Sequence, residues 1–299
     1  MTEWICIRAE FPTKPEDWSP AISAFEEHGC PGVLETDDPP ALTAYLVANG
    51  SGQKQAETLA HVLYRLGAHR VDISTVPDED WSEVWKQHFK PIRIGPRIVV
   101  QPTWEPFDPK PDDLPISLDP GQAFGTGDHP TTRMCLEALQ ELPLLGKRVL
   151  DVGCGSGILS MAAALLGAAQ VLGTDIDPVA VDVARANIDR ELSPLAANTP
   201  HPYRLIEFVV CDGLESLQER GRWDVVVSNI ISATLIRLAP DVAEVVEPGG
   251  AWVTSGVILD NWPDMLAAAE SVGFVLEELR KAGDWTCARF RMPEARAQR

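Results

Sequence analysis

The first 77 residues alternate between apolar and polar positions as strands do, with two stretches of helical spacing between them. Residues 4–11, 33–36, 41–47 and 71–76 follow the two-residue period of strands, and residues 18–28 and 52–66 place apolar side chains three or four positions apart. The order strand, helix, strand, strand, helix, strand predicts a small ferredoxin-like α+β domain over residues 1–77.

Residues 78–90 predict a separate amphipathic helix. Acidic residues fill its first turn, Trp81, Trp85 and Phe89 share one face, and Pro91 ends it. Two tryptophans on one face could form an interface with a partner, but a linker helix packed between two domains explains them more simply.

Residues 91–299 predict a second domain, in which strands and helices alternate after a strand-like lead-in at 97–102 and a Pro- and Asp-rich loop at 107–115. We expect strands at 148–152, 170–175, 205–211, 223–229, 250–257, 274–278 and 288–292, and helices at 131–141, 158–166, 178–191, 232–246 and 262–272. Such alternation is typical of an α/β fold, a mostly parallel sheet with helices on both faces. The last two strands lack a long helix between them, which predicts an antiparallel hairpin at one edge.

The strand at 148–152 runs into a glycine turn made by Gly153, Gly155 and Gly157, and Asp151 stands two residues before the first glycine. The next strand ends in Asp175. In an open α/β sheet, glycines let the backbone approach a nucleoside and the second acid accepts hydrogen bonds from its ribose. An ordinary tight strand–helix turn is the simpler alternative, but the downstream acid favours a cofactor.

The glycine spacing favours S-adenosylmethionine as that cofactor. A dinucleotide fingerprint needs a third glycine where Ile158 stands, and no Gly-Lys-Ser/Thr follows as in a nucleotide-binding P-loop. Asp151 suits a cofactor with a cationic amino-acid end better than a pyrophosphate.

Acids at two further strand ends extend the predicted nucleoside site. Asp212, after the third strand, can accept from an adenine amino group, although an Asp-Gly turn explains it nearly as well. Asp177 precedes Pro178 and is interpreted as a helix N-cap.

Asn229 ends the fourth strand and marks the predicted reaction centre. Its amide oxygen and the carbonyl of Ile230 can accept from an amine N–H and orient a neutral nucleophile for in-line methyl transfer. A lysine amine, with an ordinary pKa of about 10.4, must lose its proton first, and uncharged acceptors do not hold it as ammonium. Asn229 could instead be a turn residue that satisfies backbone groups.

A glycine-rich stretch at 118–132 precedes this centre in sequence. Thr131 and Thr132 open a helix whose N–H groups and hydroxyls can face a ligand. His129 could shuttle a proton, but a lone loop histidine is more often structural.

Composition limits the remaining functions. The net charge of −19 disfavours nucleic-acid binding and suits a basic polypeptide partner, or only a solvated surface. Six scattered cysteines without a Cys-x-x-Cys pair predict reduced thiols and no metal site. The polar start and the lack of a long apolar run predict no signal peptide and no membrane contact, and therefore a cytoplasmic protein, expected to be a monomer.

The strings EDWSEVWKQHFKP, DPGQAFGTGDHPTT, LDVGCGSGILS, GTDIDP and SNI closely resemble the bacterial ribosomal protein L11 methyltransferases. The resemblance implies a Rossmann-like class I methyltransferase domain that uses S-adenosylmethionine to methylate lysine ε-amines and the N-terminal α-amine of L11. It implies substrate recognition by the N-terminal domain, repositioning of that domain by the linker helix, and cofactor contacts at Thr132, Gly153, Asp175 and Asn229. Asp128 departs from the family, which usually has an uncharged or basic residue there.

Two other functions stay open from sequence alone. One is an N-methyltransferase for another protein or a small molecule, and the other is an inactive ribosome-associated binding module. The intact Gly153, Asp175 and Asn229 weigh against the module.

Overall fold

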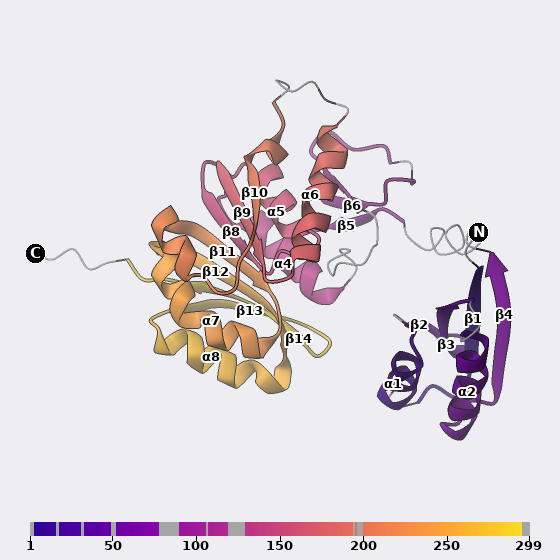
Figure 1. Ribbon diagram of the computed structural model, residues 1–299. Helices are drawn as coiled ribbons and strands as arrows, with labels where there is room; N and C mark the ends of the chain where they lie inside the picture. Colours follow the sequence, from indigo (N-terminus) through magenta and orange to yellow (C-terminus); the bar gives the residue numbers. More distant parts are fainter. Residues whose placement is uncertain are drawn as a thin grey trace, which may run out of the picture. The chain divides into compact units, whose positions relative to one another are not determined.

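The computed structural model describes residues 3–15, 18–30, 33–48, 52–77, 90–105, 107–118, 129–193, 195 and 200–294. The chain forms two compact units, residues 1–89 and 90–299 (Figure 1). Almost all of the predicted linker helix, the glycine-rich loop up to Asp128, and the end of the chain lie outside the described residues. These interpretations therefore stay predictions.

The N-terminal unit has the predicted order of elements. They are β1 (Glu3–Glu10), α1 (Ser19–Glu27), β2 (Val33–Asp37), β3 (Pro40–Val47), α2 (Gly52–Arg65) and β4 (Arg70–Pro77). The antiparallel sheet has the order β2-β3-β1-β4, with β1 between β3 and β4. Ile5 and Ile7 of β1 pack with Phe25 of α1 and with Leu59 and Leu63 of α2 in one core. The ferredoxin-like order read from periodicity is confirmed.

The larger unit is built on a seven-stranded sheet with the order β10-β9-β8-β11-β12-β14-β13. Its strands are β8 (Arg148–Val152), β9 (Gln170–Asp175), β10 (Ile206–Val210), β11 (Trp223–Asn229), β12 (Val246–Ile258), β13 (Val275–Ala282) and β14 (Trp285–Arg291). Strands β8 to β12 are parallel, whereas β14 runs antiparallel to both β12 and β13. The predicted sheet and its terminal hairpin are both confirmed.

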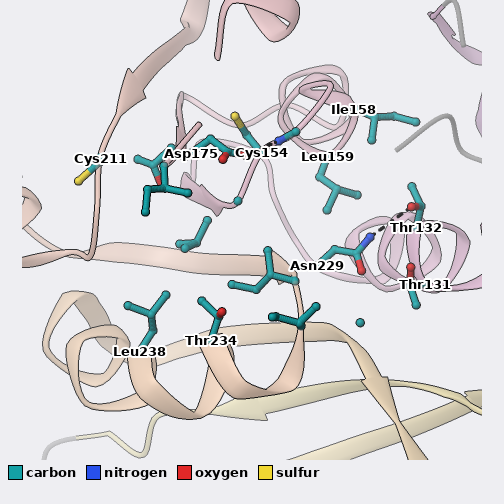
Figure 2. A pocket seen from close by; sticks show the side chains of 18 of the residues that line it. Thr131, Thr132, Cys154, Ile158, Leu159, Asp175, Cys211, Asn229, Thr234 and Leu238 are labelled. Atoms are coloured by element: carbon teal, nitrogen blue, oxygen red, sulfur yellow. Dashed lines mark hydrogen bonds between the residues drawn. The ribbon is translucent and has the colours of Figure 1, made fainter. Parts of the chain in front are cut away.

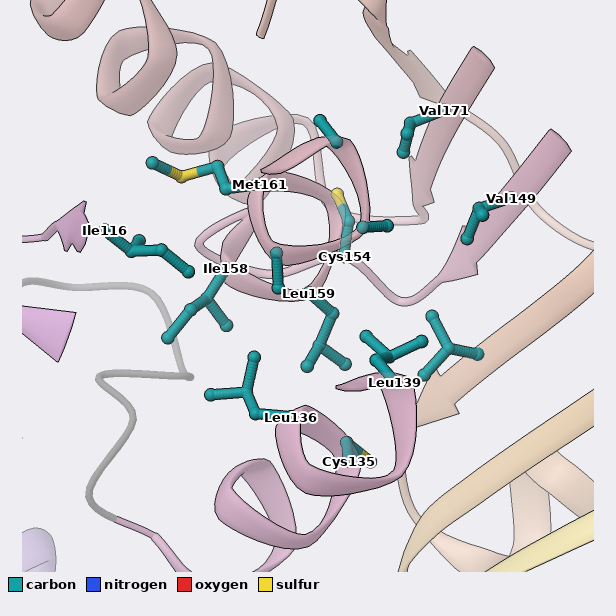
Figure 3. Close-up of a cluster of buried hydrophobic side chains, with 14 of the residues drawn as sticks. Ile116, Cys135, Leu136, Leu139, Val149, Cys154, Ile158, Leu159, Met161 and Val171 are labelled. Carbon is teal, nitrogen blue, oxygen red and sulfur yellow. The ribbon is translucent and has the colours of Figure 1, made fainter. Parts of the chain in front are cut away.

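Helices cover both faces of this sheet, as predicted (Figure 1). They are α4 (Pro130–Glu141), α5 (Ile158–Leu165), α6 (Pro178–Leu192), α7 (Ser232–Val245) and α8 (Trp262–Ser271). Val149 and Val227 face one core, where α4, α5 and α6 pack, and the alternate positions Leu150 and Val226 face the other, with α7 and α8. Figure 3 shows the first core, with Leu136 and Leu139 of α4 beside Ile158 and Leu159 of α5.

Some predicted boundaries are wrong. A three-stranded sheet forms from β5 (Ile92–Ile94), β6 (Ile98–Gln101) and β7 (Leu114–Ser117). The strand β5 was not expected, and β7 begins inside the loop that we expected at 107–115. The strand β7 forms in spite of Pro115 because it pairs in parallel with β6 and buries Ile116. The hairpin strands also extend further than predicted, up to the turn at Gly283, since exposed polar residues conceal the alternation there.

Three short 3-10 helices were not expected: η1 (Pro202–Leu205), η2 (Glu215–Arg220) and η3 (Leu259–Asn261). In the part of the chain that the structure describes, every helix is too short or too polar to cross a bilayer.

Candidate active site

A cavity of about 650 Å³ opens at the carboxyl ends of the central parallel strands (Figure 2). Its walls come from the turn after β8, the ends of β9 and β11, the segment after β10, and helices α4 and α7. Eight predicted site residues line it: His129, Thr132, Gly153, Gly155, Asp175, Asp212, Asn229 and Ile230. The volume lies in the range of cofactor-sized pockets, and its position is the usual ligand site of open α/β sheets.

The glycine turn is held against β9 and against Ile230. The N–H groups of Gly153 and Cys154 both donate to the carbonyl of Thr174, over 2.8 and 2.9 Å. A Cβ on Gly153, which has φ of +76°, would lie 2.3 Å from Ile230 Cγ2. A Cβ on Gly256, with φ of +84°, would lie 2.4 Å from the Ile230 carbonyl oxygen. Ile230 is therefore fixed between two glycines that no other residue can replace without movement.

Asp175 is oriented before any ligand arrives. Its Oδ2 accepts from the N–H of Gly155 and its Oδ1 from the N–H of Asp177, each over 3.0 Å. Each carboxylate oxygen keeps a further lone pair, and the side chain is part of the cavity wall. Such a carboxylate can accept two adjacent hydroxyls, as a ribose offers.

Asp212 lies in the same part of the wall but is much more exposed, at 70% of its side chain, and its Oδ1 is 3.9 Å from Arg237 of α7. The predicted N-cap role of Asp177 is confirmed, because its Oδ1 accepts from the N–H of Val179 over 2.9 Å.

Asp151 does not line the cavity. It is fully buried, and its Oδ2 accepts from Ser160 Oγ of α5 over 2.7 Å. Burial raises the pKa of this carboxyl to about 7, with the charge of Asp175 adding to the shift. The direct contact that we expected between Asp151 and the cationic end of a cofactor is not supported by this position.

Gly157 also lies outside the wall. It is the N-cap of α5 with a left-handed backbone, and a Cβ there would lie 2.9 Å from Phe208 Cζ of β10. Its small size brings α5 close to the sheet, which places the glycine turn correctly but gives Gly157 no surface on the cavity.

Asn229 and Thr132 join β11 to the first turn of α4. Asn229 Nδ2 donates to Thr132 Oγ1 over 3.2 Å, and Asn229 Oδ1 is buried without a hydrogen-bond partner among the described residues (Figure 2). An unpaired buried carbonyl oxygen costs free energy, and such groups are often found at functional sites. This arrangement leaves one neutral acceptor in the wall of the cavity.

His129 acts first as a helix cap. Its Nδ1 accepts from the N–H of Thr131 and lies 2.7 Å from Thr131 Oγ1. Its ring packs edge-on against Trp285, with the centroids 5.1 Å apart. This cap is the structural role that we weighed for the histidine. Because the ring also lines the cavity, the proton-shuttle role stays a prediction.

Sequence reasoning missed several residues of the wall, among them Gly256 of β12, Arg237 of α7 and Trp285 of β14. Gly256 could have been found by examining the end of the fifth strand in the same way as the first four. Trp285 could not, because only the insertion of β14 between β12 and β13 brings it to this edge.

Charge is unevenly distributed in the cavity. Among the described residues of its wall, the carboxylates are Asp175 and Asp212. Neither of them is hydrogen-bonded to Asn229 or Thr132, or next to either residue in the sequence. Within the described residues, no three His, Cys, Asp or Glu side chains form a group that could hold a metal ion.

A sheet of this order with β14 antiparallel, a glycine turn after the central strand β8 and a carboxylate at the end of β9 defines a Rossmann-like, S-adenosylmethionine-dependent methyltransferase of class I. The chain belongs to the ribosomal protein L11 methyltransferase (PrmA) family, whose family model matches residues 10–293. The resemblance noted in the sequence is therefore confirmed.

Individual relatives agree with this membership. A ribosomal protein L11 methyltransferase of Geobacter metallireducens is 46% identical over 215 residues, 72% of this chain and 67% of that protein. One of Pelotomaculum thermopropionicum is 39% identical over 270 residues, 89% of this chain and 84% of that protein. The crystal structure of the ribosomal protein L11 methylase of Lactobacillus delbrueckii subsp. bulgaricus superposes with a TM-score of 0.59 at 26% identity, covering 69% of this chain and 100% of that one.

Proposed function

We propose that this protein transfers methyl groups from S-adenosylmethionine to amino groups of ribosomal protein L11, namely lysine ε-amines and the N-terminal α-amine. Family membership supports the donor and the protein substrate. The observation that carries the chemistry is the orientation of Asn229, whose nitrogen is engaged by Thr132 and whose oxygen has no partner among the described residues.

The cavity fits the methyl donor. Asp175, already oriented by two backbone N–H groups, would accept the ribose hydroxyls, and Asp212 lies where an adenine amino group can be recognised. The glycine turn would admit the amino-acid part, since Gly153 and Gly155 line the cavity without side chains. When bound, S-adenosylmethionine supplies a methyl group activated by its sulfonium.

The protein's own residues would prepare the amine. Asn229 Oδ1 and the Ile230 carbonyl are neutral acceptors, which can align an amine lone pair without stabilising the ammonium form. Trp285 and Ile231 add apolar surface to the wall, and desolvation there lowers the pKa of a lysine amine. The absence of a carboxylate beside Asn229 among the described wall residues acts in the same direction, because an anion would raise that pKa.

We assign recognition of L11 to the N-terminal unit, with residues 78–90 as the linker between the two units. Residues 3–77 form a separate four-stranded sheet with two helices, β1 to β4 with α1 and α2. These residues have their own core and are free to serve a partner. The activity needs no nucleic acid, and we expect a cytoplasmic monomer.

Incubation of purified L11 with labelled S-adenosylmethionine and this protein tests the proposal. Label on L11, mapped by mass spectrometry to lysine and N-terminal amines, is the expected result. Label only on other proteins or small amines would point to a different N-methyltransferase, and binding of L11 without label would indicate an inactive module. Asn229→Ala, which keeps the cofactor residues Gly153 and Asp175, is the matched negative control.

A further inference from the structure

A second hollow of about 400 Å³ lies between the start of α4 and the end of β13, and we call it the α4–β13 cleft. Three cations and one acid are part of its lining: Arg133, Arg280, Lys281 and Glu137. Cations are scarce in this chain, which has 25 Lys and Arg against 44 Asp and Glu. The three cations around this hollow therefore give it the opposite charge to that of the chain as a whole.

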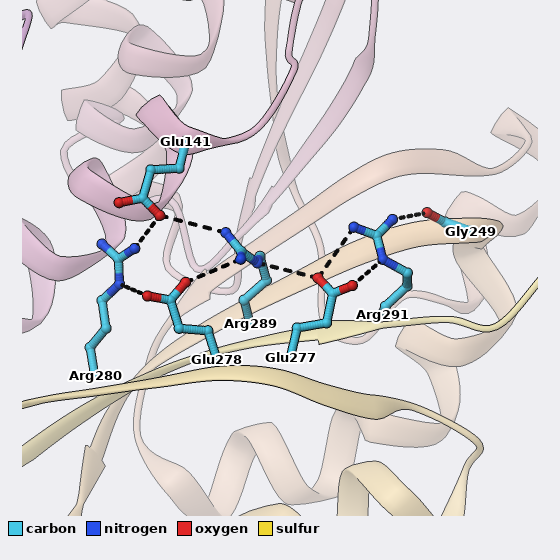
Figure 4. Close-up of polar contacts among 7 residues, drawn as sticks. All are labelled: Glu141, Gly249, Glu277, Glu278, Arg280, Arg289 and Arg291. Carbon is cyan, nitrogen blue, oxygen red and sulfur yellow. Dashed lines mark hydrogen bonds and ion pairs between the residues drawn. The ribbon is translucent and has the colours of Figure 1, made fainter.

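One of these cations is already neutralised. Arg280 belongs to a ladder of ion pairs that runs along the β13–β14 hairpin (Figure 4). It contacts Glu278 over 2.9 Å, is 3.9 Å from Glu137, and also pairs with Glu141 of α4. Its charge is thus used inside the protein, and the ladder fixes α4 against the hairpin.

The other two cations are not used in this way. Arg133 is half-buried and Lys281 is exposed, and within the described residues neither side chain forms a hydrogen bond or an ion pair. Half-burial makes the unpaired Arg133 informative, because a guanidinium that has lost part of its hydration gains more from an anion than a fully exposed one.

The α4–β13 cleft and the active-site cavity share the same two supporting segments. At the start of α4, His129 lines the cavity and the next residue, Pro130, lines the cleft. Across the hairpin turn, Trp285 lines the cavity and Ala282 lines the cleft. His129 and Trp285 are in ring contact, so the cleft and the cavity adjoin at this point. A polypeptide whose amine enters the cavity from this side would lie beside the cleft.

We propose that the α4–β13 cleft binds an acidic side chain of the polypeptide substrate, next to the amine that is methylated, through Arg133 and Lys281. This rests on the proposed function, since it describes how the protein acceptor of that reaction is held. The cleft would then give this acidic protein a second electrostatic contact with its substrate, in addition to its attraction to the target lysine. It selects amines that have a carboxylate nearby on the folded substrate.

A carboxylate fits better than a nucleic-acid phosphate backbone. Binding along a backbone requires a row of cations that release several counterions, whereas this cleft has two available cations, with Glu137 on its wall. Arginine and lysine around one hollow can hold a single carboxylate from two sides.

Steady-state methylation of purified L11 by the full-length protein tests the inference. The double variant Arg133→Gln/Lys281→Gln should raise KM for L11 roughly tenfold and leave kcat and the Kd of S-adenosylmethionine unchanged. Salt should raise KM for the unaltered protein more than for the double variant, because screening acts on the pairs that the variant lacks. Lys110→Gln, which removes one exposed cation from the connection between β6 and β7, is the control and should leave KM unchanged.

The outcomes separate this inference from the proposed function. An unchanged KM and an unchanged salt dependence in a folded, active double variant would show that the cleft does not bind the substrate. The proposed methylation of L11 would be unaffected by that result. A KM that changes only when L11 is presented on a ribosomal particle, and not as free protein, would also overturn it in favour of an RNA contact. Failure of the unaltered protein to methylate L11 would instead overturn the proposed function. Methylation of N-acetyl-lysine methylamide, which has no carboxylate, should be equal in both proteins.

Discussion

Asn229 Nδ2 donates a hydrogen bond to Thr132 Oγ1 over 3.2 Å, joining residues 97 positions apart. Because the amide nitrogen is engaged, the amide oxygen is the atom left to accept from a substrate amine. In the reaction that we propose, Thr132 would therefore contribute by fixing the orientation of Asn229, in addition to any contact with the cofactor.

Thr132→Val is expected to lower kcat by about 10- to 100-fold, because the Asn229 amide loses the acceptor that orients it. Thr132→Ser keeps the hydroxyl and should retain most of the activity. Steady-state methylation with saturating L11 and saturating cofactor measures kcat for both variants. Equal rates for the valine and serine variants would show that the hydrogen bond does not position Asn229.

Gly153→Ala is expected to destabilise the fold and weaken cofactor binding. The new Cβ would meet Ile230 Cγ2 at 2.3 Å, and φ of +76° is unfavourable for alanine. Adding Ile230→Ala removes Cγ2 and should restore part of the thermal stability but not the backbone strain. Differential scanning fluorimetry of Gly153→Ala, Ile230→Ala and the double variant separates the two causes. A double variant no more stable than Gly153→Ala would refute the clash.

The sequence allowed us to predict which side chains at the ends of strands reach the cavity. It did not allow the same prediction for side chains on the faces of strands. Asp175 is the last residue of β9, so its side chain reaches the carboxyl edge. Asp151 is the fourth residue of the five-residue strand β8. Its side chain therefore points to the same face of the sheet as Val149, where it contacts Ser160 of α5. We expect a direct contact between Asp151 and the cofactor when only the sequence motif is considered. The alternation of side chains along the strand argues against that contact.

Contacts between elements far apart in the sequence were the second feature that the sequence could not predict. Trp285 belongs to the active-site wall, and Arg133 and Lys281 meet in one cleft, only because β14 inserts between β12 and β13 and α4 packs beside the hairpin. Local periodicity contains no information about which distant elements become neighbours. The ion pairs that neutralise Arg280 but leave Arg133 unpaired are equally invisible before the fold is known.

Asp175→Ala is expected to weaken binding of S-adenosylmethionine by about 100-fold, because it removes the ribose acceptor and also releases the N–H groups of Gly155 and Asp177. Asp175→Asn retains one carbonyl acceptor and should lose less. Isothermal titration calorimetry gives the two affinities, and wild-type affinity in the alanine variant would exclude the ribose role.

A chain of residues 90–299 should bind S-adenosylmethionine with unchanged affinity and fail to methylate L11. Its two cores and the described cavity wall lie wholly within those residues, so the cofactor site should remain folded. Calorimetry and the labelled-methyl assay test the two statements separately. Efficient methylation of L11 by the shortened chain would show that the N-terminal unit is not the recognition domain.

Asp151→Asn should stabilise the protein at pH 8 and change little near pH 4. The folded-state pKa of Asp151, about 7, lies above the ordinary 3.8, so the folded state binds the proton more tightly than the unfolded state does. The stability from this group is complete below about pH 4 and is lost as pH rises to about 7, by up to about 1.4 kcal/mol per pH unit. Asparagine cannot ionise and avoids that loss.

Urea unfolding at pH 5 and pH 8 measures this difference, and the stability of Asp151→Asn relative to the unaltered protein should rise by roughly 3 kcal/mol between them. Ser160→Ala serves as the matched test, because the Ser160 hydrogen bond lowers the pKa of Asp151. Its removal should raise that pKa further, so that the loss of stability still begins near pH 4 but continues to higher pH. A stability difference between Asp151→Asn and the unaltered protein that does not vary with pH would mean that Asp151 is ionised in the folded protein throughout this range.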